Sequence, residues 1–210
     1  MVIQCLLCVL IGYLVGTFNP SYILGLIKGV DIRKIGSGNA GASNALLNFG
    51  KLAGVLCALT DIGKTCLAIF VCRLLFAEVE SSAVLCGVAC ILGHIFPFYM
   101  HFKGGKGLAC YGGMLIMYNW KLFFVFLFLE LVIALITDYI CFVPMTASVI
   151  FPIVYLVISE DIIGALMLFA IAVIILIKHT ENIKRILSGT EVRISYLWRK
   201  EKELERIKKK

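Results

Sequence analysis

Long apolar runs, most of them close to the length needed to cross a lipid bilayer, constrain this 210-residue chain more than any other feature. Hydrophobic residues make up 61% of the sequence and charged residues 16%, against about 45–50% and about 25% in soluble domains. The mean hydropathy is +0.99. The sequence therefore predicts an all-α, polytopic membrane protein.

We expect seven transmembrane helices. One of them, Leu108–Tyr118, has only 11 residues, which is short for a span of about 20, so it either crosses with its ends covered by neighbours or is re-entrant. The other expected spans are Val2–Ile27, Lys51–Phe76, Ala83–Phe102, Leu122–Thr137, Ile140–Ile158 and Ile162–Ile177.

The charges between the spans predict the orientation. Lys28, Arg33 and Lys34 follow the first span, so the positive-inside rule places the N-terminus outside and the next loop in the cytoplasm. Two acidic links, Ala77–Ser82 and Ser159–Asp161, then fall outside. An odd number of crossings leaves the C-terminus in the cytoplasm.

The end of the chain differs in composition from the rest. We expect residues 1–191 to form an integral membrane domain and residues 192–210 a basic cytoplasmic tail. From Arg193 to Lys210 there are eight Lys or Arg and three Glu, which is +5 of the net charge of +7. This indicates an anionic membrane surface as the partner and no nucleic acid. Residues Tyr196–Lys210 predict an interfacial helix or, equally, a solvated and frayed terminus.

Two features concern packing inside the bilayer. Gly12 and Gly16 form a small-xxx-small face for close helix contact, and Asn19-Pro20 predicts a break near the end of the first span. Asp61 and Lys64 lie on one face of the next span, where a structural ion pair is favoured over contact with a substrate. The nine cysteines lack the spacing of a metal site, so we expect packing residues and no metal. We also expect no cofactor.

The first polar motif is Lys34–Gly50, in which glycines alternate with Ser and Asn. Glycine allows backbone N–H groups to converge into a nest that binds anions. Irregular polar backbone at membrane depth is tolerated only where protein or water covers it. We interpret the stretch as a loop that holds an anionic headgroup; a flexible surface loop is the alternative.

The second motif, Gly93–Gly107, carries Lys103 and Lys106 on either side of Gly104-Gly105. Lysine is a compact charge suited to phosphate, and the spacing does not match a P-loop. The alternative for either lysine is a topology signal, although such a signal needs no paired glycines. His94 and His101 are expected to be structural.

The third motif is Lys178–Glu191. His179 and Asn182 lie three residues apart on one helical face, and His179 is suited to act as a general base or as a donor to phosphate. Taken alone, however, this motif is better explained by residues 180–182 capping an interfacial helix from Asn182 to Ser188 that ends at Gly189. Glu191 is expected to form an ion pair with one of Lys184, Arg185 and Arg193.

Taken together, these motifs closely resemble the bacterial acyl-phosphate:glycerol-3-phosphate acyltransferase family, over about residues 12–191. The matching residues are Gly36-Ser37-Gly38-Asn39, Gly41-Ala42-Ser43-Asn44, Asp61-Ile62-Gly63-Lys64, Gly93-His94-Ile95-Phe96-Pro97, Phe102-Lys103-Gly104-Gly105-Lys106-Gly107, His179, Asn182-Ile183, Arg185, Gly189 and Glu191. Three motifs in order are far more specific than one glycine-rich loop.

The resemblance implies an enzyme in the bacterial plasma membrane with its active site facing the cytoplasm. It would move a fatty acyl group from acyl-phosphate to glycerol 3-phosphate, giving lysophosphatidic acid and phosphate for phospholipid synthesis. It would use no metal, and its partners would be these two substrates and membrane lipids. The implied catalytic residues are Ser37, Lys106, His179 and Asn182. The implied substrate-binding residues are Gly38, Asn39, Gly41, Asn44, Lys103, Gly104 and Gly105.

Two positions depart from the family pattern. Leu47 stands where the family usually has Arg, and Cys141 stands where it tends to have Ser. Lys51, Arg33 or Lys34 are the nearby cations that would replace the guanidinium. We expect Lys106 to neutralise the departing phosphate with the help of Lys103 and the glycine amides. The rival hypotheses are a transporter of a small phosphorylated anion, and a diverged paralogue with another acceptor or little activity.

Overall fold

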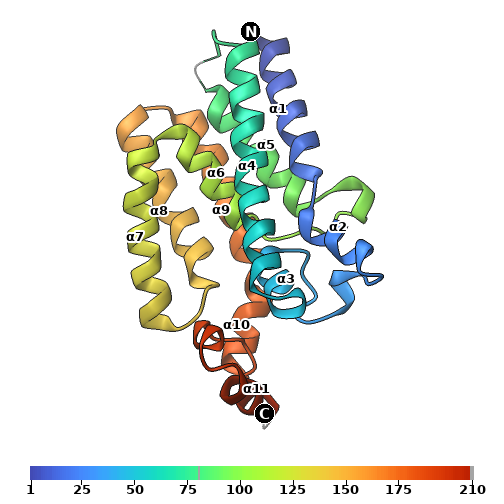
Figure 1. Cartoon of the computed structure of the whole chain (residues 1–210). Coiled ribbons are helices and arrows are strands. Elements are labelled where there is room, and N and C mark those ends of the chain that lie inside the picture. Colours follow the sequence, from blue (N-terminus) through green and yellow to red (C-terminus); the bar gives the residue numbers. More distant parts are fainter. Residues whose placement is uncertain (80, 209–210) are drawn as a thin grey trace. The chain divides into compact units, whose positions relative to one another are not determined.

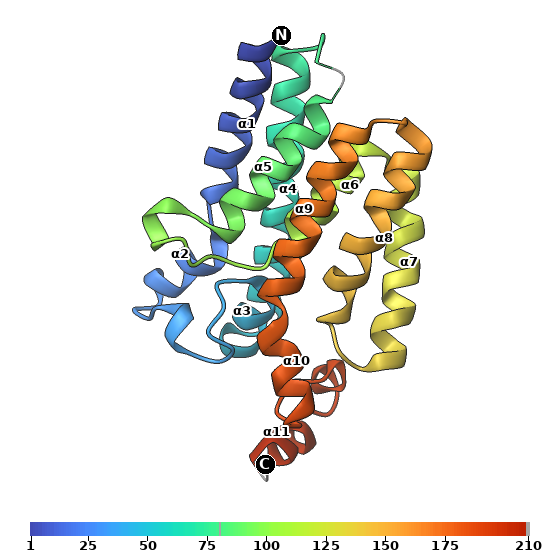
Figure 2. The same ribbon diagram turned by 180° about the vertical axis from the view of Figure 1, so that it is seen from behind.

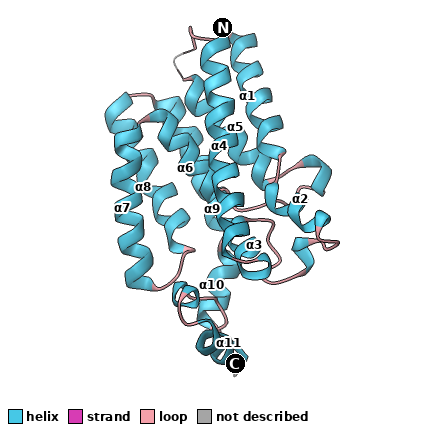
Figure 3. Cartoon of the chain, viewed as in Figure 1, coloured by secondary structure: helices cyan, strands magenta, loops and turns pink. Residues whose placement is uncertain are grey.

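The computed structural model describes residues 1–79 and 81–208, and throughout this part of the chain the regular structure is helical (Figure 1, Figure 3). Glu80 of the predicted outer link and Lys209 and Lys210 of the tail lie outside the described residues. Within the described residues, six helical segments are long and apolar enough to cross a membrane. The chain is thus a multi-pass membrane protein.

The chain divides into two compact units, residues 1–123 and 124–210. The first unit contains α1 (Val2–Thr17), α2 (Pro20–Ile27), the 3-10 turn η1 (Ile32–Lys34), α3 (Ala42–Phe49), α4 (Lys51–Leu75), α5 (Ser82–Ile95), η2 (Phe98–Met100) and α6 (Leu108–Tyr118). The boundary between the units falls within α7 (Trp120–Thr137).

The predicted small-residue face of α1 packs along α5, and the two helices lie side by side in both views (Figure 1, Figure 2). A Cβ on Gly12 or Gly16 would collide with the backbone carbonyl of Cys86 or Cys90 of α5. A Cβ on Gly93 would likewise meet the backbone of Tyr13. Glycines on both helices therefore bring the two backbones into contact, as the spacing predicted.

The predicted break at Asn19-Pro20 is present. α1 ends at Thr17, and α2 starts at Pro20, with Asn19 as the N-cap whose Oδ1 accepts from the backbone N–H of Tyr22 at 2.8 Å. Proline suits this first helical position because its missing N–H is not needed there. The break turns the chain out of the first span and into the polar loop.

α5 is shorter than predicted, because it ends at Ile95 and not at Phe102. The residues after it form η2 and an irregular stretch, Lys103–Gly107, in which the N–H groups of Gly104 and Gly105 donate to the last carbonyls of α5. Those returning hydrogen bonds satisfy the end of the helix. Apolar composition alone does not distinguish the segment after α5 from a continuation of the helix.

The second unit contains the rest of α7, α8 (Phe142–Ser159), α9 (Ile162–Lys178), α10 (Thr180–Leu187), η3 (Ile194–Leu197) and α11 (Lys200–Lys208). The predicted helix of the third motif, 182–188, begins two residues earlier as α10 and is followed by Gly189 at a φ of +73°. Part of the tail is folded as η3 and α11, so its described residues are not a frayed terminus.

Candidate active site

Asn44 organises the first polar loop. Its side chain is fully buried, and its Nδ2 donates to the carbonyls of Ile32 and Ile35 at 2.9 and 3.0 Å. Its Oδ1 accepts from the backbone N–H of Ser37 and from Asn48 Nδ2, both at 2.9 Å. All four hydrogen-bonding positions of the amide are therefore used inside the protein. Asn44 shapes the loop and holds the backbone of Ser37.

The glycines before and after Ser37 are required by this geometry. Gly36 and Gly38 have φ values of +56° and +73°, a region that side chains other than glycine rarely adopt. A Cβ on Gly36 would also collide with the side chains of Asn44 and Asn48. The turn leaves Ser37 and Gly38 exposed, with Asn39 half-buried and Gly41 buried at the start of α3.

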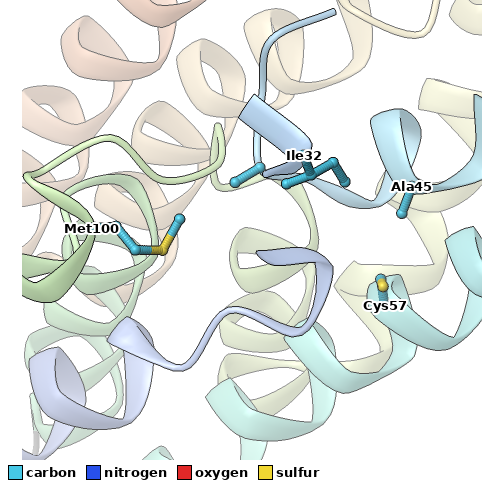
Figure 4. Packing of buried hydrophobic residues seen from close by; sticks show 5 residues of the cluster. Ile32, Ala45, Cys57 and Met100 are labelled. Carbon is cyan, nitrogen blue, oxygen red and sulfur yellow. The ribbon is translucent and has the colours of Figure 1, made fainter. Parts of the chain in front are cut away.

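A small apolar cluster joins the first loop to the segment after α5 (Figure 4). Its buried members are Ile32, Ala40, Ala45, Cys57 and Met100, which come from the first loop, α3, α4 and η2. The contact explains how two motifs that lie far apart in the sequence meet at one end of the first unit.

Polar contacts reinforce this junction. Arg33 donates from Nη1 to the carbonyl of Met100 at 2.7 Å, while its Nε and Nη2 bind Asp31 at 2.8–3.2 Å. The guanidinium also lies 4.8 Å from the ring centroid of Tyr22. These bonds hold the pKa of Asp31 down at about 2 and raise that of Arg33, chiefly through the side-chain hydrogen bonds between them. Asn19 Nδ2 adds a bond to the carbonyl of Ala40 at 2.9 Å.

The two glycines of the second motif serve close packing. A Cβ on Gly105 would collide with the ring of His94, and one on Gly104 would collide with the carbonyl of His94. Their N–H groups donate to the carbonyls of Ile95 and His94, each at 3.0 Å. These two amides therefore close the end of α5. Lys103 is exposed and Lys106 half-buried on the stretch that they hold.

Beneath the second motif lies a buried charged network. Lys64 Nζ is 2.7 Å from Asp61 Oδ1, 3.0 Å from His94 Nδ1 and 2.5 Å from the carbonyl of Phe18. This confirms the ion pair predicted between Asp61 and Lys64 and the structural role of His94. Cys110, Asp61 and His94 each offer a metal-ligand atom within 4.8 Å of the others, but the ammonium of Lys64 supplies the cation that balances this carboxylate.

The third motif belongs to the second unit. His179 is buried at the end of α9, and its Nδ1 lies 2.7 Å from the carbonyl of Ile175. Because a carbonyl can only accept, Nδ1 carries the proton, so in the neutral ring Nε2 is the basic nitrogen. Asn182 is buried one turn on in α10, and its Nδ2 donates to Glu191 Oε1 at 2.6 Å. Arg185 Nε binds Glu191 Oε2 at 2.6 Å, the predicted ion pair.

Sequence reasoning missed the roles of Asn19 and Arg33. From the sequence, Asn19 is expected only to break the first helix, and Arg33 only to act as a topology signal and a spare cation. Asn directly before Pro at a helix start is itself a capping signal, so the first role was detectable. Nothing local in the sequence pairs Arg33 with the carbonyl of Met100, because that contact spans 67 positions.

The fold and these loops define a class: a multi-pass helical membrane protein that presents ordered, glycine-rich polar loops with lysine, serine and histidine. The chain matches the glycerol-3-phosphate acyltransferase family over residues 6–189, and it belongs to that family.

Relatives of this family cover nearly the whole chain. A glycerol-3-phosphate acyltransferase of Thermotoga petrophila is 35% identical over 89% of this chain and 94% of its own length. One from Lactiplantibacillus plantarum is 34% identical over 97% and 99%. The crystal structure of PlsY (YgiH), an integral membrane glycerol 3-phosphate acyltransferase, in its glycerol 3-phosphate form has a TM-score of 0.83 at 30% identity, covering 92% of this chain and 96% of that one. Its lysophosphatidic acid form has a TM-score of 0.78.

Proposed function

We propose that this chain is a membrane acyltransferase that transfers a fatty acyl group to glycerol 3-phosphate and so makes lysophosphatidic acid. Membership of the family over residues 6–189 is the observation that carries this proposal. The solved relatives in their glycerol 3-phosphate and lysophosphatidic acid forms support the acceptor and the product. As the donor we propose acyl-phosphate, with inorganic phosphate as the second product.

The reaction proposed is a direct acyl transfer. The primary hydroxyl oxygen of glycerol 3-phosphate attacks the acyl carbonyl carbon, the bond from that carbon to the phosphate oxygen breaks, and phosphate leaves. Because acyl-phosphate is an activated mixed anhydride, positioning and charge neutralisation supply most of the acceleration without a covalent acyl-enzyme. The hydroxyl proton passes to His179 Nε2 or to a substrate phosphate oxygen.

The other residues take supporting roles. Lys106, with Lys103 beside it, neutralises the phosphate, and Ser37 and Asn182 orient the substrates. Gly38, Asn39 and Gly41 shape the first loop, Asn44 holds it, and Gly104 and Gly105 fix the stretch that bears the lysines. Lysine side chains supply the positive charge, so the scheme needs no metal.

Leu47 stands where the family usually has Arg, so binding of the proposed acceptor needs a cation from another residue. Arg33 is an unsuitable substitute, because its guanidinium is committed to Asp31 and the carbonyl of Met100. We assign this role to Lys34, which is exposed on η1, or to Lys51, which is exposed at the start of α4.

For the topology we propose seven crossings in the bacterial plasma membrane, with the N-terminus outside and the active site facing the cytoplasm. α6, the fourth segment along the chain, is the crossing that we add to the six long spans. At 1.5 Å per residue its 11 residues extend about 17 Å, less than a hydrocarbon core of about 30 Å. Residues 1–191 form the membrane domain and 192–210 the cytoplasmic tail.

The test uses purified protein with acyl-phosphate and glycerol 3-phosphate, and it measures release of phosphate and formation of lysophosphatidic acid. His179→Ala should lower kcat/KM at least about 100-fold, since it removes the proposed general base. Ser37→Ala should lower it about 100-fold, since it removes a group that orients the substrates. Ser159→Ala, at the end of α8, is the control and should keep the wild-type rate. Transfer from acyl-CoA or acyl carrier protein but not from acyl-phosphate would overturn the donor. Uptake of glycerol 3-phosphate into sealed vesicles without turnover would overturn the enzyme.

A further inference from the structure

The tail folds back onto the loop that ends the third motif, and this part of the chain lies beyond the segment matched by the family, which ends at residue 189. Its first contact is with the turn between α7 and α8. The backbone N–H and the hydroxyl of Ser195 donate to the two carboxylate oxygens of Asp138, each at 2.9 Å. The N–H of Ile194 donates to the carbonyl of Asp138 at 2.9 Å. The tail is therefore tied down before α11 begins.

Arg206 of α11 makes the second attachment. Its guanidinium donates to the carbonyl of Gly189 and, at 2.6 Å, to the carbonyl of Glu191. The same side chain binds the carboxylate of Glu203, and that carboxylate accepts from the backbone N–H of Arg193 at 2.9 Å. The clasp formed by Arg206 and Glu203 therefore binds both ends of the segment 189–193.

The burial pattern of α11 separates this clasp from the charges that face solvent. Glu203 is only 5% exposed, whereas Lys200, Lys202 and Glu205 are exposed. Residues 203 and 206 are neighbours on one helical face. The guanidinium of Arg206 keeps the pKa of Glu203 below its ordinary value, which is consistent with a carboxylate that stays charged in this contact. One face of a basic helix thus makes specific internal contacts.

The segment that the clasp holds carries the side chain that orients Asn182. Glu191 binds Asn182 Nδ2 through Oε1 and Arg185 Nε through Oε2, both at 2.6 Å. Its own backbone N–H donates to the carbonyl of Arg185 at 3.0 Å. Any displacement of the backbone at Glu191 therefore moves the hydrogen-bond partner of Asn182.

We propose that the tail is an intramolecular strap, in which Arg206 and Glu203 act as positioning residues that hold Glu191 and, through it, the amide of Asn182. This inference rests on the proposed function, because Asn182 is a catalytic residue only in that scheme. A 1 Å misplacement at a distance from the chemistry is enough to cost about 100-fold in rate. Part of the tail is accordingly a component of the enzyme, and its role is not only to present positive charge to the membrane surface.

The test compares Arg206→Met with Lys202→Met, which removes the same charge from an exposed position of the same helix. The first measurement is hydrogen exchange of the peptide 180–192 in the full-length protein. Arg206→Met should raise the exchange rate of the amides of Thr190 and Glu191 at least about tenfold, and Lys202→Met should leave it unchanged. Equal exchange in the two variants would overturn the strap, whatever the protein catalyses.

The second measurement is steady-state kinetics on the folded fraction of each variant. Arg206→Met should lower kcat about tenfold with a smaller change in KM for the acyl donor, while Lys202→Met keeps both at wild-type values. Arg206→Lys, which reaches one carbonyl but lacks the forked geometry, should fall between them. Faster exchange with unchanged kcat would overturn the positioning role. A wild-type protein without acyl transfer would overturn the proposed function and leave the exchange result standing.

Discussion

The backbone N–H of Ser37 donates to the buried side chain of Asn44 at 2.9 Å, so the exposed serine is held by an amide seven positions later. The same amide binds the carbonyls of Ile32 and Ile35. Asn44 therefore fixes the position of Ser37, the proposed substrate contact. Asn44 itself has no spare hydrogen-bonding capacity for a ligand.

Replacement of Asn44 tests this dependence. Asn44→Ala removes four hydrogen bonds and leaves buried carbonyls without donors, so we expect a loss of about 2–4 kcal/mol in the free energy of unfolding. Activity should fall with it, because the Ser37 turn loses its anchor. Thermal unfolding in detergent and the acyl-transfer assay measure the two effects. Asn48→Ala, which removes only one bond to Asn44 Oδ1 and one to its carbonyl, is the milder comparison. Equal effects of the two substitutions would contradict the central role of Asn44.

Gly105 should not tolerate even one methyl group. Gly105→Ala places a Cβ against the ring of His94, and we expect a loss of about 1–3 kcal/mol with reduced activity, since overpacking shifts the stretch that carries Lys106. Gly63→Ala is the matched control. No atom lies within 4 Å of a Cβ at that helical position, so the change should be neutral or stabilising by up to about 1 kcal/mol. The prediction fails if both variants behave alike in unfolding and turnover.

The ion pair of Asp61 and Lys64 should show strong coupling between its members. Lys64→Met leaves the buried carboxylate without its ammonium, and Asp61→Asn leaves the ammonium without its carboxylate; each should cost about 3–5 kcal/mol. The double variant should cost clearly less than the sum, because neither charge is then left alone. A double-mutant cycle on thermal unfolding measures this coupling, and additive losses would argue against a paired network.

The contact between Asp31 and Arg33 should show in the pH dependence of stability. The pKa of Asp31 falls from 3.8 to about 2 in the folded protein, so the folded state binds this proton less readily than the unfolded state. Its contribution is present above pH 3.8 and is lost as the pH falls through about 2. Because the pair is partly exposed, we expect about 1 kcal/mol. The stability difference between wild type and Asp31→Asn should stay constant from pH 5 to 7 and shrink below pH 4; a difference that persists at pH 2 would disprove the assignment.

The apolar runs were sufficient to predict most helices, because burial in lipid requires long uninterrupted segments whose backbone bonds are all internal. α6 matches its predicted range, and α4 and α9 match theirs to within one residue at either end. α5 does not match its predicted range, because its last carbonyls accept hydrogen bonds from the N–H groups of Gly104 and Gly105. The composition of the segment does not reveal these hydrogen bonds. The three motifs and the residue types of the candidate site were likewise visible in the sequence.

By itself the sequence determined that this chain crosses a membrane, that its polar residues gather in three short motifs, and which family those motifs resemble. The tertiary structure decided what each polar group does. Internal hydrogen bonds occupy the side chain of Asn44 and the backbone amides of Gly104 and Gly105. Arg33 joins two loops, and Arg206 binds the backbone at the end of the third motif. The physical reason is that a hydrogen bond depends on which donor and acceptor meet, and residues distant in the chain meet only once the helices have packed.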